Sequence, residues 1–219
     1  MIYSILIVMN YKHIIWDWNG TLLDDRTMCV KSINQVLMAK GLPVITLEKY
    51  MCLFTFPVKA FYEKLGFDFT KNSFDDIGDG FIDFYNKNFK LLKLHKNTVS
   101  TLLYIKKMGR TQAVLSAAMD EMLKNWISDH DLRTFFTDIV GVDNQYAHGK
   151  IDIGKRYIEK VDINRKEILM IGDTPHDSEV AEAMGIDCIL VEHGHVSKGR
   201  LQETGRKTFQ NFLEIKKYL

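Results

Sequence analysis

The sequence predicts an α/β fold, a Rossmann-like doubly wound parallel sheet with an inserted α-helical domain. Short apolar runs that each end in a polar residue recur along the chain, helical patterns separate the later runs, and one long segment carries helical patterns only. Runs of four or five apolar residues are typical of strands buried on both faces, and their alternation with helices predicts a parallel sheet. A length of 219 residues suits such a core with one substantial insertion.

Five apolar runs are the predicted core strands. They span residues 13–16, 112–115, 139–142, 168–172 and 188–191, and are followed by Asp17, Ser116, Asp143, Asp173 and Glu192. Helical patterns near residues 98–108, 120–130, 152–161 and 175–184 connect the later strands. Ligands bind beyond the carboxyl ends of the strands in sheets of this kind. We therefore expect the functional site where these polar residues lie.

The segment from about residue 24 to residue 94 carries three helical patterns and no convincing strand. The first is an apolar stripe (Val30, Ile33, Val36 and Leu37) that ends before Gly41 and Pro43, the second runs from Pro57 to Gly66, and the third from Phe74 to Phe89. Nine of the thirteen phenylalanines lie between Phe54 and Phe89. We therefore predict an α/β core of residues 1–22 and 96–219, and a helical cap of residues 23–95 with its own apolar core.

Composition excludes several classes of partner. Lysine plus arginine number 29 against 28 acidic residues, so no global charge favours nucleic acid or an anionic membrane. Three scattered cysteines argue against a disulfide framework and favour a cytoplasmic protein. The apolar run in residues 1–9 is far shorter than the ~20 residues of a spanning helix. It is either an edge strand or a start assigned too early, with Met9 as the true beginning.

Asp17, Asn19, Gly20 and Thr21 follow the first predicted strand directly. A carboxylate at the end of a buried strand, followed by a glycine turn, presents an oxygen nucleophile beside backbone N–H groups. Aspartate can serve as a covalent nucleophile in phosphoryl transfer. The same segment is also a common turn between a strand and a helix, so by itself it does not decide between the two.

A second acidic segment, Gly172 to Asp177, follows the fourth predicted strand. Thr174 and Asp177 have the spacing of a capping pair for a helix that Pro175 begins. Capping does not explain Asp173, which we expect to converge with Asp17 at the strand ends. Clustered carboxylates favour a hard cation, and Mg²⁺ prefers oxygen ligands together with substrate phosphate.

Ser116 and Lys150 complete the candidate site. Ser116 ends the second predicted strand and can donate a hydrogen bond to a phosphoryl oxygen. Lys150 precedes a helix that Asp152 is expected to cap. A lysine at a helix start opposes the helix dipole, which makes an anionic partner plausible there. Either residue alone is more simply explained as a surface side chain.

Together these four segments resemble the haloacid dehalogenase (HAD) hydrolase superfamily. Its pattern is Asp-x-Asp-Gly-Thr, then an apolar strand that ends in Ser or Thr, then Lys, then Gly-Asp-x-x-x-Asp. The resemblance extends from Lys12 to Val191. The position of the helical insertion is similar to that of the phosphoglycolate-phosphatase-like branch. This resemblance implies a magnesium-dependent phosphatase that acts on a small phosphorylated metabolite.

The resemblance also implies roles for individual residues. Asp17 would be the nucleophile that forms an aspartyl phosphate. Asp17, the backbone carbonyl of Asn19 and Asp173 would hold Mg²⁺, with Asp177 supporting that shell. The phosphoryl group would be bound by Ser116, Lys150, Gly20 and Thr21.

Asn19 departs from the family pattern, which has a second aspartate at this position. In phosphatase members that aspartate protonates the leaving alcohol and then activates water, and an amide does neither. General acid–base catalysis contributes roughly 10²–10⁴ in rate. Three explanations are open: a nearby histidine (His176, His193 or His195) substitutes, only activated esters or acyl phosphates react, or the Asn19–Gly20 pair deamidates to aspartate.

Two further readings stay open at this point. One alternative to the phosphatase is a catalytically impaired module that binds phosphorylated ligands. The other is a hydrolase of carbon–phosphorus or carbon–halogen bonds. A phosphonate-cleaving member needs a Schiff-base lysine in the cap, for which the candidates are Lys40, Lys49, Lys59 and Lys64. The sequence is compatible with a monomer or a homodimer.

Overall fold

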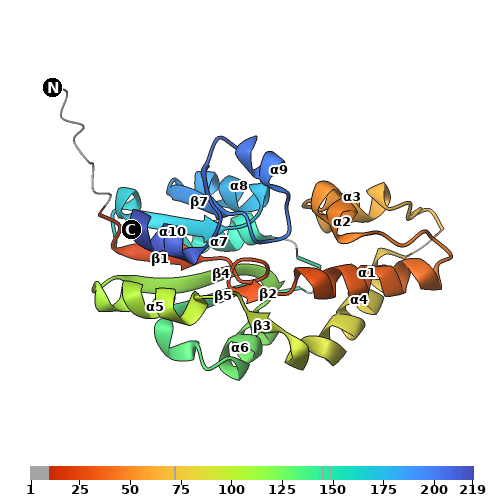
Figure 1. Ribbon diagram of the computed structural model, residues 1–219, viewed down its shortest axis with the longest axis horizontal. Coiled ribbons are helices and arrows are strands. Elements are labelled where there is room, and N and C mark those ends of the chain that lie inside the picture. Colours follow the sequence, from red (N-terminus) through yellow and green to blue (C-terminus); the bar gives the residue numbers. More distant parts are fainter. Residues whose placement is uncertain (1–9, 72, 145, 148) are drawn as a thin grey trace.

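The computed structural model describes residues 10–71, 73–144, 146–147 and 149–219, and Figure 1 shows their arrangement. Its centre is a six-stranded sheet in which every neighbouring pair is parallel, with the order β5-β4-β1-β6-β7-β8. The strands are β1 (His13–Trp16), β4 (Thr111–Met119), β5 (Asp138–Val142), β6 (Ile168–Gly172), β7 (Asp187–Val191) and β8 (Lys207–Phe209). The predicted α/β fold class is confirmed. The question about Met9 concerns residues outside the described part of the chain.

Two strands differ from the prediction. The short edge strand β8 was not predicted, because its three residues carry too little apolar pattern. Strand β4 continues past Ser116 to Met119, and its register with β5 shifts between Leu115 and Met119. Ser116 therefore lies in an irregular stretch of β4 and not at the end of the strand.

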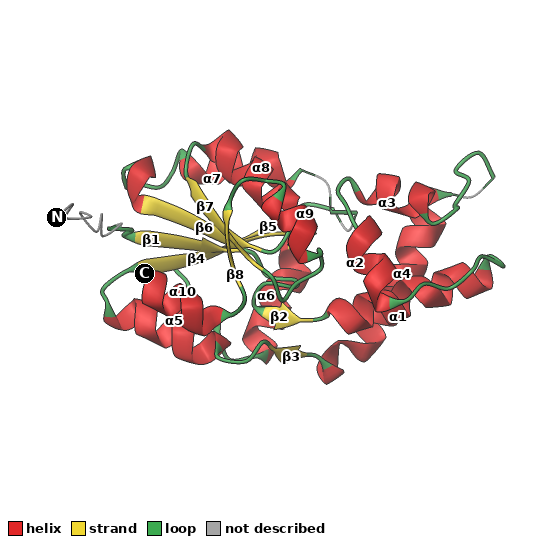
Figure 2. Ribbon diagram, turned by 45° about the horizontal axis from the view of Figure 1, so that its top comes forward, coloured by secondary structure: helices red, strands yellow, loops and turns green. Residues whose placement is uncertain are grey.

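Helices cover both faces of the sheet, as Figure 2 shows. Ile14 and Trp16 of β1 belong to one apolar cluster, with Phe212 on the covering helix, while Ile15 belongs to the other, with Val180. This alternation explains why the strand reads as a continuous apolar run. The core helices are α5 (Thr98–Lys107), α6 (Asp120–Asp129), α7 (Lys150–Ile158), α8 (Pro175–Met184), α9 (Lys198–Gln202) and α10 (Phe212–Tyr218), with single 3₁₀ turns at Arg133–Phe135 and Arg165–Glu167.

Four helices make up most of the inserted segment. They are α1 (Arg26–Ala39), α2 (Leu47–Leu53), α3 (Val58–Lys64) and α4 (Phe74–Asn88), followed by a 3₁₀ turn at Phe89–Leu91. Helix α2 was not predicted, although Thr46 caps it by accepting from the Lys49 N–H. Gly80 of α4 faces α1, where a Cβ atom would lie 3.4 Å from Val36. A glycine that weakens the helix thus allows α1 and α4 to pack closely.

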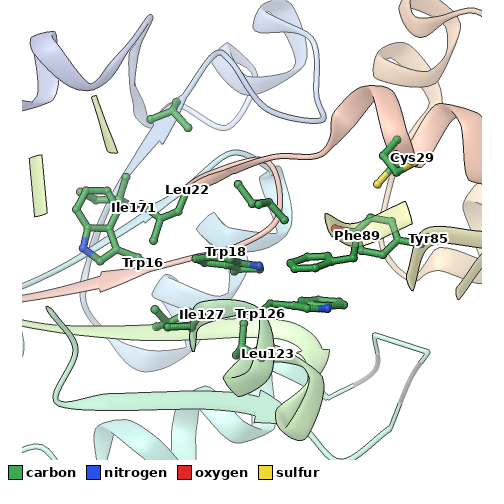
Figure 3. Packing of buried hydrophobic residues seen from close by; sticks show 14 of the residues in the cluster. Trp16, Trp18, Leu22, Cys29, Tyr85, Phe89, Leu123, Trp126, Ile127 and Ile171 are labelled. Atoms are coloured by element: carbon green, nitrogen blue, oxygen red, sulfur yellow. The ribbon is translucent and has the colours of Figure 1, made fainter. Parts of the chain in front are cut away.

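The inserted segment begins and ends at a two-stranded antiparallel pair, β2 (Leu23–Asp24) with β3 (Lys93–Leu94). Beside this pair, Trp126 of α6 stacks on Phe89 with ring centroids 4.9 Å apart and lies 5.5 Å from the Tyr85 ring. Figure 3 shows these rings packed against one another. Through these contacts the end of α4 and the turn after it pack on α6. The division of the chain into a core and a cap stays a prediction. None of the described helices is both long and apolar enough to span a membrane.

Candidate active site

Three buried carboxylates converge at the carboxyl ends of the central strands. Asp17 follows β1, and its N–H donates to the Ile171 carbonyl across 2.9 Å. Asp173 follows β6, and Asp177 lies in the first turn of α8. Carboxylate oxygens of the three residues lie within 4.8 Å of one another. The strand-end residues Asp143 and Glu192 are not part of this cluster: Asp143 is exposed, and Glu192 pairs with Lys198 across 3.1 Å.

The start of α8 positions Asp177 as the capping pattern predicts. Thr174 and Asp177 form a reciprocal capping box, and Pro175 is the first helical residue. Asp177 Oδ2 accepts from the Asp173 and Thr174 N–H groups, at 3.1 Å and 3.0 Å, and from the Thr174 hydroxyl at 2.7 Å. This oxygen is saturated by donors, so Asp177 mainly orients the loop that presents Asp173.

Lys150 is the cation at the centre of the cluster. Its ammonium lies 2.6 Å from Asp17 Oδ1 and 2.6 Å from Asp177 Oδ1, and its side chain is 3% exposed. Burial would lower the pKa of Lys150, but the two carboxylates raise it above its ordinary value. The expectation that Asp152 caps α7 is wrong, because the helix begins at Lys150 and Gly149 occupies the N-cap position. Starting the helix at Lys150 lets its side chain reach the cluster.

The cluster carries more negative charge than Lys150 balances. Burial, with repulsion from Asp177 and Asp173, raises the pKa of Asp17 to about 8 despite the nearby ammonium. Burial, with repulsion from Asp177, also raises the pKa of Asp173 to about 6. When all three carboxylates are ionised, they and the one ammonium carry two net negative charges, which is the charge that a divalent cation compensates. The oxygen-rich donor set therefore fits Mg²⁺.

The turn after β1 brings Gly20 and Thr21 close to the same carboxylates. Thr21 Oγ1 lies 2.8 Å from Asp173 Oδ1 and 3.3 Å from Asp17 Oδ2. Gly20 has a φ of 75°, and a Cβ atom there would collide with Asp173 and the His195 ring. The Gly20 N–H donates to Asp25 Oδ1 across 2.8 Å. A role for Gly20 and Thr21 in binding phosphate stays a prediction, since the Gly20 N–H and the Thr21 hydroxyl already have protein partners.

Asn19 belongs to a buried network that sequence reasoning missed. Its Nδ2 donates to Asp25 Oδ2 at 2.8 Å and to the Tyr85 hydroxyl at 3.0 Å. Asp25 Oδ1 lies 3.1 Å from His195 Nε2, and His195 Nδ1 lies 3.0 Å from the Tyr50 hydroxyl. Nothing in the spacing of Asp25 distinguishes it from the exposed Asp24 beside it. Only the fold brings the Asp25 carboxylate into contact with the Asn19 side chain.

The network holds Asp25 and His195 as an ion pair. Burial alone would raise the pKa of Asp25, but the His195 imidazolium and the hydrogen bonds from Asn19 and Tyr85 hold it at about 2. Burial alone would lower the pKa of His195, and Asp25 raises it to about 9. The two charges compensate each other. The His195 imidazolium also acts to lower the pKa of Asp173, so it offsets part of the excess negative charge of the acidic cluster.

Of the three histidines proposed as substitutes for the missing aspartate, His195 is the one that lines the candidate site. His176 pairs with Glu179 across 2.8 Å and stacks on Phe56. His193 lies 3.1 Å from the Thr21 carbonyl oxygen, and its ring is tilted against that of His95 with centroids 3.9 Å apart. His195 reaches the site because Gly194 allows its loop to contact Asp173: the His195 N–H donates to Asp173 Oδ2 across 2.7 Å. A Cβ atom at position 194 would collide with that carboxylate.

A cavity of ≈160 Å³ leads from these carboxylates to the space between α2–α4 and α6. Asp17, Asn19, Ser116, Lys150 and Asp177 all line it. Ser116 is 1% exposed, and its Oγ accepts from the Ala118 N–H. Candidate residues from four separate segments of the sequence therefore meet at one cavity. The cap lysines Lys40, Lys49, Lys59 and Lys64 are exposed and do not line it, so the structure gives no support to a Schiff-base lysine among them.

Comparisons with known proteins agree on one fold and one family. A family model described as haloacid dehalogenase-like hydrolase matches residues 14–191. A phosphoglycolate phosphatase of Pseudomonas syringae pv. tomato is 22% identical over 191 residues, which cover 84% of this chain and 70% of that protein. Another, from Aliivibrio fischeri, is 20% identical over 196 residues, which cover 84% of this chain and 85% of that protein.

Solved structures give the same result for the fold. The crystal structure of a protein described as a predicted phosphatase from Clostridium acetobutylicum has a TM-score of 0.79 at 22% identity, covering 94% of this chain and 97% of that one. That of CbbY from Rhodobacter sphaeroides in complex with phosphate has a TM-score of 0.73 at 17% identity, covering 94% and 96%.

Proposed function

The chain belongs to the haloacid dehalogenase-like hydrolase family and is a hydrolase of phosphoric monoesters; from this premise we propose that it is a magnesium-dependent phosphatase of a small phosphorylated molecule. The observation that carries this proposal is the pairing of Asp17 with Lys150 across 2.6 Å at one end of the cavity. A carboxylate and an ammonium so placed can supply a nucleophile and neutralise the charge of a phosphoryl group. The similarity to phosphoglycolate phosphatases is one of architecture, which does not identify the substrate. The residues that line the cavity determine which substrate fits.

The reaction takes place in two steps on Asp17. A carboxylate oxygen of Asp17 bonds to phosphorus while the bond to the alcohol oxygen breaks, and the electron pair stays on that oxygen. Water then attacks the phosphorus of the aspartyl phosphate, and the bond to Asp17 breaks to regenerate the carboxylate. Of the two protons of water, one ends on the alcohol and the other on the phosphate. Ser116 and Lys150 would bind the phosphoryl oxygens in both steps.

Asp17, the backbone carbonyl of Asn19 and Asp173 would hold Mg²⁺, with Asp177 fixing the loop of Asp173. When bound, the ion would compensate the excess negative charge of the carboxylates and of the phosphoryl group. Thr21 orients both acids, because its hydroxyl lies within 3.3 Å of an oxygen of each. Hydrogen bonds and ion pairs hold these residues in place without substrate, and preorganised groups of this kind stabilise a transition state electrostatically.

Asn19 removes the usual proton donor and narrows the substrates to those with good leaving groups, unless another residue replaces it. His195 is the best placed of the candidates, since it lines the cavity and is paired with Asp25. Deamidation of Asn19 would place two carboxylates 2.8 Å apart in a buried site, which like-charge repulsion opposes. A binding module without turnover is the second candidate function, and the same Asn19 favours it.

Hydrolysis of p-nitrophenyl phosphate and acetyl phosphate with Mg²⁺ tests the proposal. We expect turnover that chelation abolishes and that Asp17→Asn removes. The matched control is Asp143→Asn, which alters an exposed aspartate at the end of another core strand and should leave turnover unchanged. Wild-type protein that binds phosphate but hydrolyses neither ester would favour the binding module instead.

A further inference from the structure

The cavity is aromatic on the side formed by the inserted helices. Phe54 follows α2, Phe61 belongs to α3, and Phe81 and Tyr85 belong to α4. Tyr50, Phe54 and Phe61 already pack against one another, with ring centroids 5.1 to 5.5 Å apart. Phe81 stacks on Tyr85 at an interplanar angle of 16°. The wall is therefore built from aromatic rings that pack against one another in the structure without a ligand.

The opposite wall comes from β4 and α6 and is also apolar. Ala117 and Ala118 of β4, with Met122 and Trp126 of α6, line it. Trp126 is held by Phe89 and Tyr85 (Figure 3). Small residues beside Asp17 and large ones farther out leave a space that an apolar group can enter while its phosphate lies at the carboxylates.

Positive charge among the described lining residues is confined to the catalytic end of this cavity. The basic side chains of that lining are those of Lys150 and His195. Lys150 is bound to Asp17 and Asp177, and His195 to Asp25. A second anionic group, such as the carboxylate of phosphoglycolate, would meet no further basic side chain in the described lining. Burying an unpaired charge is strongly unfavourable, so the lining disfavours a small acid and favours an aromatic group.

Asn19 points independently to the same class of substrate. An amide cannot protonate the departing oxygen, and both ring nitrogens of His195 already have partners in Asp25 and Tyr50. A leaving group that is stable as an anion is therefore favoured. A phenol has a pKa of about 10, as in tyrosine, whereas an alkoxide resembles hydroxide, whose parent water has a pKa of about 15.7. Phenolate therefore departs without a proton far more readily than an alkoxide does.

We propose, on the basis of the proposed phosphatase function, that the substrate is an aryl phosphate, the phosphoric monoester of a small phenol. Asp17 displaces the phenolate from phosphorus, and the phenolate departs without a proton as the P–O bond breaks. Water then hydrolyses the aspartyl phosphate as described above. A cavity of ≈160 Å³ is on the scale of roughly 150 Å³ that holds benzene in an engineered protein. A cavity of this size can hold an aromatic ring.

Binding of phosphonates, which cannot be hydrolysed at the P–C bond by this route, tests the aromatic subsite apart from turnover. Calorimetric titration with Mg²⁺ present should show phenylphosphonate binding at least tenfold more tightly than methylphosphonate. Phe81→Ala should reduce that ratio by threefold or more. Phe84→Ala is the matched control, because Phe84 lies on the same helix α4 but does not line the cavity. Equal affinity of the two phosphonates in the wild-type protein, or an equal effect of both variants, would overturn the proposal.

Steady-state kinetics with phenyl phosphate, ethyl phosphate and phosphoglycolate test the substrate class. We expect kcat/KM for phenyl phosphate to exceed both others by at least a hundredfold. A preference for phosphoglycolate overturns the aryl phosphate assignment and leaves the phosphatase function intact. If no ester is hydrolysed, including p-nitrophenyl phosphate, while phenylphosphonate still binds more tightly, the phosphatase function fails and the aromatic subsite stands.

Discussion

The side-chain amide of Asn19 donates to the buried carboxylate of Asp25 across 2.8 Å. The two residues are six positions apart, and the turn at Gly20 folds one onto the other. Asp25 receives further hydrogen bonds from Tyr85 and the Gly20 N–H and pairs with His195. An amide at position 19 and a carboxylate at position 25 are therefore complementary, and neither can be understood without the other.

Asn19→Asp alone should destabilise the protein, because it places two carboxylates against each other in a buried site. We expect the free energy of unfolding at pH 8 to fall by roughly 2 to 5 kcal/mol. Repulsion raises the pKa of the new pair above its unfolded value, so the loss should shrink as the pH falls towards 5. Urea denaturation at both pH values measures this effect.

The double variant Asn19→Asp/Asp25→Asn is the control for that substitution. It keeps one acid and one amide, with their positions exchanged. The oxygen of the new side-chain amide at position 25 can still accept from the Gly20 N–H, while its nitrogen donates to the new carboxylate at position 19. We expect this variant to recover at least half of the lost stability. Recovery by less than this would show that the Asp25–His195 ion pair matters more than the Asn19–Asp25 hydrogen bond.

Gly20→Ala should lower the free energy of unfolding by far more than the strain of a positive φ alone would. Gly20 has a φ of 75° and Gly109 a φ of 72°, but a Cβ atom meets Asp173 and His195 at the first position and nothing within 4 Å at the second. We expect Gly109→Ala to lose about 1–2 kcal/mol from the left-handed conformation alone. Gly20→Ala should lose several kcal/mol more and its phosphatase activity as well. Similar losses in thermal denaturation of the two variants would contradict the predicted collision.

Lys150→Met should reduce kcat by roughly 10²–10³, the usual effect of removing one group that stabilises the transition state. The variant also leaves Asp17 and Asp177 without their ammonium partner. Lys155→Met is the matched control, since Lys155 is exposed on the same helix α7. Kinetics with p-nitrophenyl phosphate should show no more than a twofold change for the control.

Magnesium should stabilise the folded protein even without substrate, because it compensates the excess charge of the Asp17, Asp173 and Asp177 cluster. At a concentration a hundred times Kd, binding contributes about 2.7 kcal/mol. The resulting rise in Tm should be largely lost in Asp173→Asn and kept in Asp83→Asn, which alters an exposed aspartate of α4. A Tm that does not respond to Mg²⁺ in the wild-type protein would argue against a metal at this cluster.

Acid should destabilise the core through His13, which lies between Thr111 Oγ1 at 2.7 Å and the Tyr157 hydroxyl at 3.0 Å. Burial lowers the pKa of His13 to about 4, against about 6.5 in the unfolded chain. Between these two pKa values the unfolded state binds more protons than the folded state. The contribution of neutral His13 to the free energy of unfolding is therefore complete above pH 6.5 and is lost as the pH falls. The slope is at most about 1.4 kcal/mol per pH unit. Urea denaturation from pH 7.5 to 5 should show a smaller pH dependence in His13→Gln than in the wild type.

Local patterns in the sequence were sufficient for the sheet, most helices and the acidic segments. Strands β1 and β6 match their predicted ranges residue for residue, because a strand buried on both faces needs a continuous apolar run. The Thr174–Asp177 capping box was predictable for the same reason, since its hydrogen bonds join residues three positions apart. Convergence of Asp17 and Asp173 followed from the rule that parallel strands end at one edge of the sheet.

Tertiary structure alone decided which residues surround those acids. His195 is far from Asp25 in the sequence, yet the two form an ion pair because the loop after β7 crosses the turn after β1. The phenylalanines of residues 54–89 predicted an apolar cap core; most of them belong to or pack against an apolar cluster, and several also line the cavity of the candidate active site. An apolar side chain has the same pattern whether it faces a core or a ligand. Its role depends on what lies opposite, and only packing between distant segments determines that.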